Sequence, residues 1–217
     1  MLGAPKPVTV HTWPQQMPLA VDALRSDPGL TVISVATPAT HDRLMARQLI
    51  RNAFRTLIGK FLDRPAASIV LVSQPGHGIS LDLPGAQLHL SVSHIPSLSV
   101  AAISRRSAIG VDVIGVGGLG GDLPDWAQVA LDYLGPAEAA QLLFSSPAHR
   151  PAAFAEAWTR HEACLKCFGL ELTEWTPALA SQLASCQVMG LSLPDHCRGT
   201  VAIGKVFALE SMESPAN

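Results

Sequence analysis

Two short segments of this 217-residue chain combine residue types that could do chemistry on a diphosphate. Trp158–Lys166 is expected to be helical and places Glu162 and Lys166 one turn apart. Ile109–Asp112 is typical of an apolar strand that carries one acid. Two carboxylates on separate rigid elements, with a lysine beside one of them, could hold Mg²⁺ against a diphosphate. Mg²⁺ usually takes one or two protein carboxylates together with phosphate oxygens and water.

The helix that carries Glu162 and Lys166 is predicted from Pro151 to about Phe168, with Gly169 as its C-terminal cap. At 100° per residue, its aromatic and small side chains form a broad apolar arc, and the two charged residues lie just past its edge. The arc is predicted to contain Phe154, Ala157, Trp158, His161, Cys164, Leu165 and Phe168. A carboxylate in that position can meet a neighbouring element. For the two residues taken alone, the alternative is a surface Glu–Lys pair worth only about 0.3–0.5 kcal/mol.

Asp112 favours the functional interpretation. It stands in Ala108–Ile114, which otherwise has the composition of a buried strand. A lone carboxylate in such a strand needs a cation, a metal ion or several N–H donors. Asp112 and Glu162 are therefore the predicted metal ligands.

A basic helix is predicted in the first half of the chain, over Asp42–Leu62 and ending before Pro65. Its apolar residues recur every four positions, and so do arginines on another face. Like charges at this spacing repel by a few tenths of a kcal/mol per pair, so an anion bound along that face would explain them. A solvated face is the alternative. The four arginines are Arg43, Arg47, Arg51 and Arg55.

The chain is predicted to be α+β, with two similar halves related by a pseudo-two-fold axis: residues 1–107, and residues 108–217 with the acids. Each half has a long helix followed by a pair of apolar strands, although such strands also look alike by chance. Residues 1–110 hold ten Lys/Arg and five Asp/Glu, and residues 111–217 hold five and twelve. A basic half facing an acidic half suits an anion bound with a metal, and unequal surface decoration is the alternative.

Composition excludes several classes of protein. A net charge of −2 argues against a general nucleic-acid binder. No run of about 18 apolar residues is present and the N-terminus lacks the apolar core of a signal peptide, so we expect a cytoplasmic protein that does not enter membranes. The spacing of Cys164, Cys167, Cys186 and Cys197 does not fit a zinc ribbon, and reduced, mostly buried thiols are predicted.

The order and spacing of three motifs resemble those of the two-domain (Sfp-type) 4′-phosphopantetheinyl transferases. Ile109–Asp112 is similar to the apolar-Gly-apolar-Asp strand of that family, and Trp158–Lys166 is similar to its Trp-x-x-Lys-Glu-Ala-x-x-Lys helix. Ser91–His94 resembles a Ser-His element that contacts coenzyme A phosphate. The resemblance covers roughly residues 41–170.

The resemblance implies transfer of 4′-phosphopantetheine from coenzyme A to a serine of an acyl or peptidyl carrier protein, with Mg²⁺ and with 3′,5′-ADP as the leaving group. Asp112 and Glu162 would hold the metal, and Lys166 would bind a diphosphate oxygen. Glu162 could also take the serine proton, directly or through a water. A doubled architecture with its cleft between the halves suggests a monomer.

The resemblance also implies residues for the 3′-phosphate and adenosine end of coenzyme A. Arg47, His77 and His94 are candidates there, and Ser93 could donate a hydrogen bond to phosphate. For Ser93 the alternative is a strand hydroxyl bonded to backbone. For His94 the alternative is a structural histidine.

Three positions depart from the family pattern. Ile114 stands where a second acid is common, His161 replaces the lysine before the glutamate, and Gly76–Gly78 replaces a Gly-Lys-Pro turn. The histidines would be charged only near pH 6.5 or below. These departures keep open a catalytically weakened, carrier-binding module with a transferase-like fold.

Two other motifs are weaker. Gly115–Gly120 satisfies G-x-G-x-x-G after a strand, which would suit a dinucleotide-binding oxidoreductase, but Gly121–Pro124 intervenes where the helix should begin. His161-Glu162 begins the zinc-protease motif H-E-x-x-H, but the second histidine is replaced by Leu165.

Overall fold

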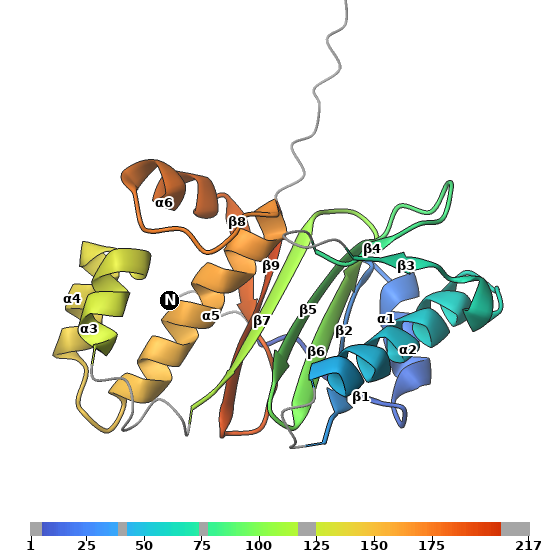
Figure 1. Ribbon diagram of the computed structural model, residues 1–217, viewed down its shortest axis with the longest axis horizontal. Coiled ribbons are helices and arrows are strands. Elements are labelled where there is room, and N and C mark those ends of the chain that lie inside the picture. The colour runs from blue at the N-terminus through green and yellow to red at the C-terminus, as the bar shows by residue number, and fades with distance from the viewer. Residues whose placement is uncertain (1–5, 39–42, 74–77, 117–124, 205–217) are drawn as a thin grey trace, which may run out of the picture.

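The computed structural model describes residues 6–38, 43–73, 78–116 and 125–204. The chain is mixed α+β, as predicted, and within the described residues it builds two main sheets and a small third one. Long helices lie over both main sheets (Figure 1).

The first main sheet has the strand order β1-β2-β6-β5. The parallel pair is β1 (Val10–Trp13) with β2 (Leu30–Ala36). The antiparallel partners are β6 (Leu98–Ser104) and β5 (His89–Ile95). One face of this sheet is covered by two helices, α1 (Met17–Arg25) and α2 (Arg43–Phe61), and the core between them is made of large apolar side chains. Its fully buried members include Leu24, Ile33, Phe54, Leu57 and Ile103.

The second main sheet has the order β7-β9-β8 and is antiparallel throughout. Its strands are β7 (Ile109–Gly115), β9 (Cys197–Gly204) and β8 (Cys186–Gly190). Helix α5 (Arg150–Phe168) lies directly against β7 and β9 (Figure 1). Gly169, in the left-handed conformation, ends α5, as predicted.

Shorter elements surround these layers. The helix α3 (Trp126–Val129) continues into a π-helical turn at Ala130–Leu134, and α4 (Pro136–Phe144) follows. α6 (Pro177–Leu183) precedes β8. The third sheet pairs β3 (Leu71–Val72) with β4 (Ser80–Leu81), after a 3-10 turn at Ala66–Ser68.

Three strands of the first main sheet have the connectivity of the second sheet. In each set, the first strand leads through a 19-residue helix to a later antiparallel pair, and the last strand of that pair inserts between the other two, giving β2-β6-β5 and β7-β9-β8. The boundary at 107/108 falls between the two sheets. The division into two folding units stays a prediction.

The two sheets also share a core, because their helix-free faces turn toward each other. Val32 and Val100 of the first sheet pack in one cluster with Val111, Val113 and Val201 of the second. β5 and β7 lie side by side (Figure 1), although they belong to different sheets.

No helix in the described ranges combines the length and apolarity needed to cross a membrane. All four cysteines are free thiols, and three of them are buried, as predicted.

Candidate functional site

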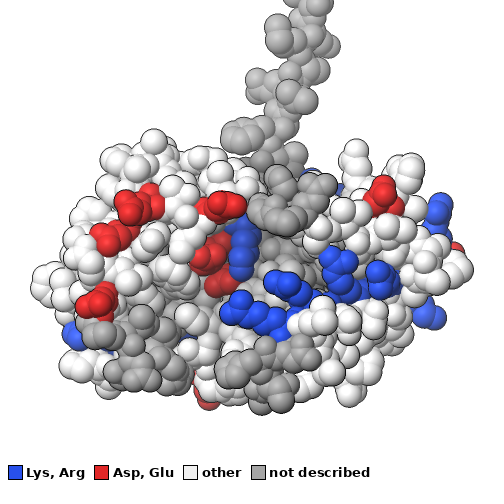
Figure 2. All heavy atoms as spheres, viewed as in Figure 1, with Lys and Arg blue, Asp and Glu red and all other residues white. Residues whose placement is uncertain are grey.

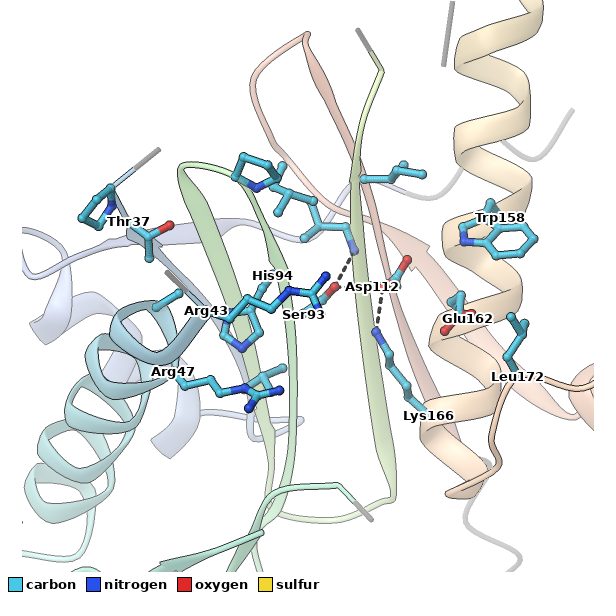
Figure 3. Close-up of a pocket in the computed structure, with 17 residues that line it drawn as sticks. Thr37, Arg43, Arg47, Ser93, His94, Asp112, Trp158, Glu162, Lys166 and Leu172 are labelled. Atoms are coloured by element: carbon cyan, nitrogen blue, oxygen red, sulfur yellow. Dashed lines mark hydrogen bonds and ion pairs between the residues drawn. The ribbon is translucent and has the colours of Figure 1, made fainter. Parts of the chain in front are cut away.

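A cleft of about 970 Å³ lies between α2, β5, β7 and α5, so both halves of the chain contribute to it. Figure 2 shows basic side chains along one side of the hollowed centre and acidic side chains along the other. Most of the predicted site residues meet here (Figure 3). The lining includes Arg43, Arg47, Ser93, His94, Asp112, Glu162 and Lys166.

Asp112 is held at the centre of this cleft by strand alternation. Its neighbours Val111 and Val113 turn into the shared core, so Asp112 turns to the opposite face, toward α5. The residue is only 7% exposed. Its Oδ1 accepts hydrogen bonds from Lys166 Nζ at 2.6 Å and from Ser93 Oγ at 2.8 Å. The buried carboxylate therefore has the charged partner that its environment demands.

Gly110 explains why α5 can lie so close to Asp112. A Cβ atom at this position would collide with the Ala163 carbonyl oxygen and lie 2.5 Å from Cys167 N. These are backbone atoms of α5, so they cannot turn aside. The glycine two residues before the acid is thus what lets the helix bring Lys166 within hydrogen-bond distance.

Glu162 lines the same cleft one turn before Lys166 on α5. Burial raises the pKa of its carboxyl group, the negative charge of Asp112 raises it further, and the ammonium of Lys166 lowers it. The two carboxylates therefore lie near enough for their charges to repel each other. A cation between them would offset both the burial and the repulsion that disfavour the ionised form of Glu162.

These two acids fit an Mg²⁺ site of the kind that relies on substrate. Within the described residues no cluster of three or more His, Cys, Asp or Glu forms a protein-only metal site. Two carboxylates beside an open cleft leave the remaining octahedral positions to phosphate oxygens and water. Ile114, which stands where a third acid could be, also lines the cleft.

The opposite wall is basic, but only part of the arginine ladder contributes to it. Arg43 and Arg47 reach from α2 into the cleft (Figure 3). Arg51, one turn further along, donates to the Leu71 carbonyl oxygen at 3.1 Å and to Ser73 Oγ. It holds the β3 segment, so its partners are structural.

His94 lies on the cleft wall with its Nδ1 2.6 Å from Ser99 Oγ. Desolvation of the ring lowers the pKa of His94, and the positive charges of Arg47 and Lys166 lower it further. The imidazole is therefore neutral at pH 7 in the free protein. An anion bound among these three groups would favour its protonation. His77 lies outside the described residues.

His161 faces away from the cleft. It lines a second pocket of about 410 Å³ on the far side of α5, where α6 and β8 contribute other walls. Burial lowers the pKa of its imidazole, Arg160 lowers it further, and its Nε2 has no partner among the described residues. His161 is therefore a neutral, buried side chain and does not replace a cation in the cleft.

Sequence reasoning missed several walls of the cleft. Thr37 follows β2, Leu172 follows α5, and both line the cavity, as does Trp158. Trp158 was assigned to the apolar arc of its helix, where it stacks on Phe154 with ring centroids 5.8 Å apart. Its position four residues before Glu162 was the available signal, because i and i+4 share a helix face.

A scan against models of known protein families finds no match, and no curated protein is recognisably similar in sequence.

Proposed function

We propose that this chain is a 4′-phosphopantetheinyl transferase, which moves phosphopantetheine from coenzyme A to a serine of an acyl or peptidyl carrier protein. One observation carries the proposal. Asp112, Glu162 and Lys166 converge in a cleft whose opposite wall carries Arg43 and Arg47. Acids and cations in that arrangement suit a diphosphate bound with a divalent metal.

The repeated strand order supports the proposed fold, in which two similar halves are related by a pseudo-two-fold axis. The sets β2-β6-β5 and β7-β9-β8 have the same connectivity. Because one chain supplies both walls of the cleft, we propose that a monomer suffices.

In the proposed reaction the serine oxygen bonds to the β-phosphorus of coenzyme A while the bond from that phosphorus to the bridging oxygen breaks, and 3′,5′-ADP leaves. Asp112 and Glu162 would hold Mg²⁺, which when bound neutralises charge on the diphosphate. Lys166 would turn its ammonium from Asp112 to a diphosphate oxygen. Arg47, with His94 beside it, would bind the 3′-phosphate end through charge-assisted hydrogen bonds.

The serine proton needs an acceptor, and Glu162 is the candidate. Its carboxylate lines the cleft in which the diphosphate would bind, so it lies in the site that the serine must enter. It would take the proton directly or through one water.

Mass spectrometry of an apo carrier protein incubated with the chain, coenzyme A and Mg²⁺ tests the proposal. The carrier should gain the mass of one phosphopantetheine group. Asp112→Ala and Glu162→Ala should each reduce the rate by about 10²–10³-fold, because each removes charge stabilisation at the reacting diphosphate. Glu156→Ala is the matched control, since Glu156 lies on the same helix with its side chain 67% exposed and pairs with Arg198.

Undiminished turnover in either cleft variant would overturn the assignment of the site. The absence of a mass gain with fatty-acid, polyketide and nonribosomal-peptide carriers would favour the alternative of a carrier-binding module. Ile114 motivates that alternative, because it leaves the cleft with an apolar side chain beside the two acids.

The oxidoreductase alternative gains no support from the strand that precedes its glycines. β7 pairs antiparallel with β9, whereas the first strand of a dinucleotide-binding unit lies in a parallel sheet. Gly117–Gly120 lie outside the described residues. Tight binding of NADH in a fluorescence titration would revive that alternative.

A further inference from the structure

The seam between the two main sheets is bridged by serine hydroxyls. β5 and β7 belong to different sheets, yet two serines of β5 reach backbone N–H groups of β7. Ser91 Oγ accepts from Val111 N at 2.9 Å, and Ser93 Oγ accepts from Val113 N at 3.3 Å. Both pairs advance by two residues in the same direction, so the two strands run parallel. Serine hydroxyls accept the hydrogen bonds that backbone carbonyl oxygens would accept in a continuous sheet.

The two serines differ in what they do with their own proton. Both residues are 6% exposed. Ser93 donates to Asp112 Oδ1 at 2.8 Å, a bond that is buried. Among the described residues, Ser91 makes no hydrogen bond to a carboxylate. A hydroxyl has one proton, so the proton of Ser93 is committed to the acid and is not available to a phosphate.

From this geometry we propose that Ser93 is a positioning residue for Asp112, and not a ligand of the coenzyme A phosphate. Ser93 and Lys166 both use Oδ1, and no described residue hydrogen-bonds to Oδ2. With Oδ1 held by these donors, Oδ2 is the oxygen left for a cation. This inference rests on the proposed metal site.

Ser93 matters most once substrate is bound. Lys166 is needed at the diphosphate in the proposed reaction, so its bond to Asp112 is the one that substrate would replace. Ser93 is the donor that stays. Its own orientation is fixed by Val113 N, and a chain of two bonds thus ties the carboxylate to the seam between the halves. Partners that orient a metal ligand typically contribute 10–100-fold to metal affinity.

Binding of Mn²⁺ in the presence of coenzyme A, followed by the electron paramagnetic resonance of free Mn²⁺, tests this without a carrier protein. Ser93→Ala should raise the dissociation constant of Mn²⁺ about tenfold or more. Ser93→Thr, which keeps the hydroxyl, should restore most of the affinity. Asp112→Ala gives the dissociation constant of Mn²⁺ expected when the site is lost.

Ser91→Ala is the matched control, because it removes the equivalent seam bond but no bond to the acid. It should lower the midpoint of thermal unfolding, though by no more than Ser93→Ala, which also loses the buried bond to Asp112, and leave Mn²⁺ affinity within about twofold of the wild type. In transfer assays, Ser93→Ala should raise the Mg²⁺ concentration for half-maximal rate while the KM for coenzyme A stays within about twofold.

Three results would overturn the inference. Equal Mn²⁺ affinities of the two alanine variants would make Ser93 a seam residue only. A raised KM for coenzyme A with unchanged Mn²⁺ affinity would make it a phosphate ligand. Absence of Mn²⁺ binding to the wild type would show that Asp112 is not part of a metal site, so Ser93 could not position a metal ligand. If instead Mn²⁺ binds as expected and no carrier is modified, the positioning role stands and the proposed transferase activity fails.

Discussion

The two long helices occupy equivalent places in the two halves but are packed in different ways. Both α2 and α5 have 19 residues and follow the first strand of a β-helix-ββ unit. The buried face of α2 is built largely from bulky side chains, with Ile50, Phe54, Leu57 and Ile58 among them. The buried face of α5 is largely small, with Ala155, Ala157, Ala163, Cys164 and Cys167 among its members.

Side-chain size decides how near each helix comes to its sheet, and therefore what each can do. Small residues and Gly110 let the backbone of α5 touch β7, so a short reach suffices to join Lys166 to Asp112 at 2.6 Å. The bulky buried face of α2 contacts its sheet less closely than α5 does, and its long Arg43 and Arg47 side chains reach the cleft from there. The C-terminal half supplies the two acids and Lys166 at short range, and the N-terminal half supplies two arginines from further away.

The largest effect is expected from removing the close approach of α5. Gly110→Ala places a methyl group against the backbone of Ala163 and Cys167, so the helix must move away from β7. Overpacking of this kind costs about 3 kcal/mol, which corresponds to a Tm lowered by about 10 °C in a protein of this size. Carrier modification should fall below detection, because Lys166 and Glu162 move away from Asp112.

Gly115→Ala on the same strand is the control. The nearest atom to a Cβ there is the His196 carbonyl oxygen at 4.0 Å. This variant should keep Tm and activity close to those of the wild type. Equal Tm and activity of the two variants would mean that α5 can move away from β7 without loss. The close packing of α5 would then not explain how the two helices differ.

An intermediate effect is expected from the basic helix. Arg47→Ala should raise the KM for coenzyme A about tenfold or more, since a hydrogen bond between charged groups is worth about 1.5–3 kcal/mol. Arg51→Ala is the control one turn away. Its guanidinium binds Leu71 O and Ser73 Oγ, so its loss should lower Tm and leave the KM unchanged. A raised KM in both variants would indicate that the ladder binds substrate along its whole length.

Local patterns predicted the residues of the C-terminal wall. Apolar alternation around Asp112 and the helical spacing of Glu162 and Lys166 are properties of single elements, and both elements formed close to the predicted bounds. The same patterns do not locate β3, because Ala66–Ser68 forms a 3-10 turn and only Leu71–Val72 pairs. A two-residue strand has too little periodicity to be recognised.

Contacts between elements could not be predicted in this way. His161 lies in the apolar arc of its helix, as predicted. The elements that cover it there are α6 and β8, and the sequence of the helix does not say which elements pack against it. The hydrogen bonds at the seam between the two sheets could not be predicted for the same reason. The hydroxyls of Ser91 and Ser93 satisfy β7 only because two sheets meet there, and a strand sequence does not say which strand lies beside it.

The smallest effect is expected from neutralising Glu162, and it should be a gain in stability. Burial and the charge of Asp112 raise the pKa of Glu162 above its ordinary 4.5, so the ionised form is less favourable in the folded chain than in the unfolded one. Glu162→Gln should therefore raise the unfolding midpoint at pH 7 in a chelating buffer. Glu156→Gln, an exposed substitution on the same helix, should change it little.

The pH dependence checks the cause of this gain. The folded wild type holds its proton more tightly than the unfolded chain, so its stability rises as pH falls through the folded pKa of Glu162. The advantage of Glu162→Gln should be full above that pKa and vanish below about pH 4.5. A lower midpoint in the variant at pH 7 would mean that the attraction of Lys166 exceeds burial and the repulsion of Asp112 together. The acids of this wall would then already be neutralised without a metal, and the need for a cation between them would disappear.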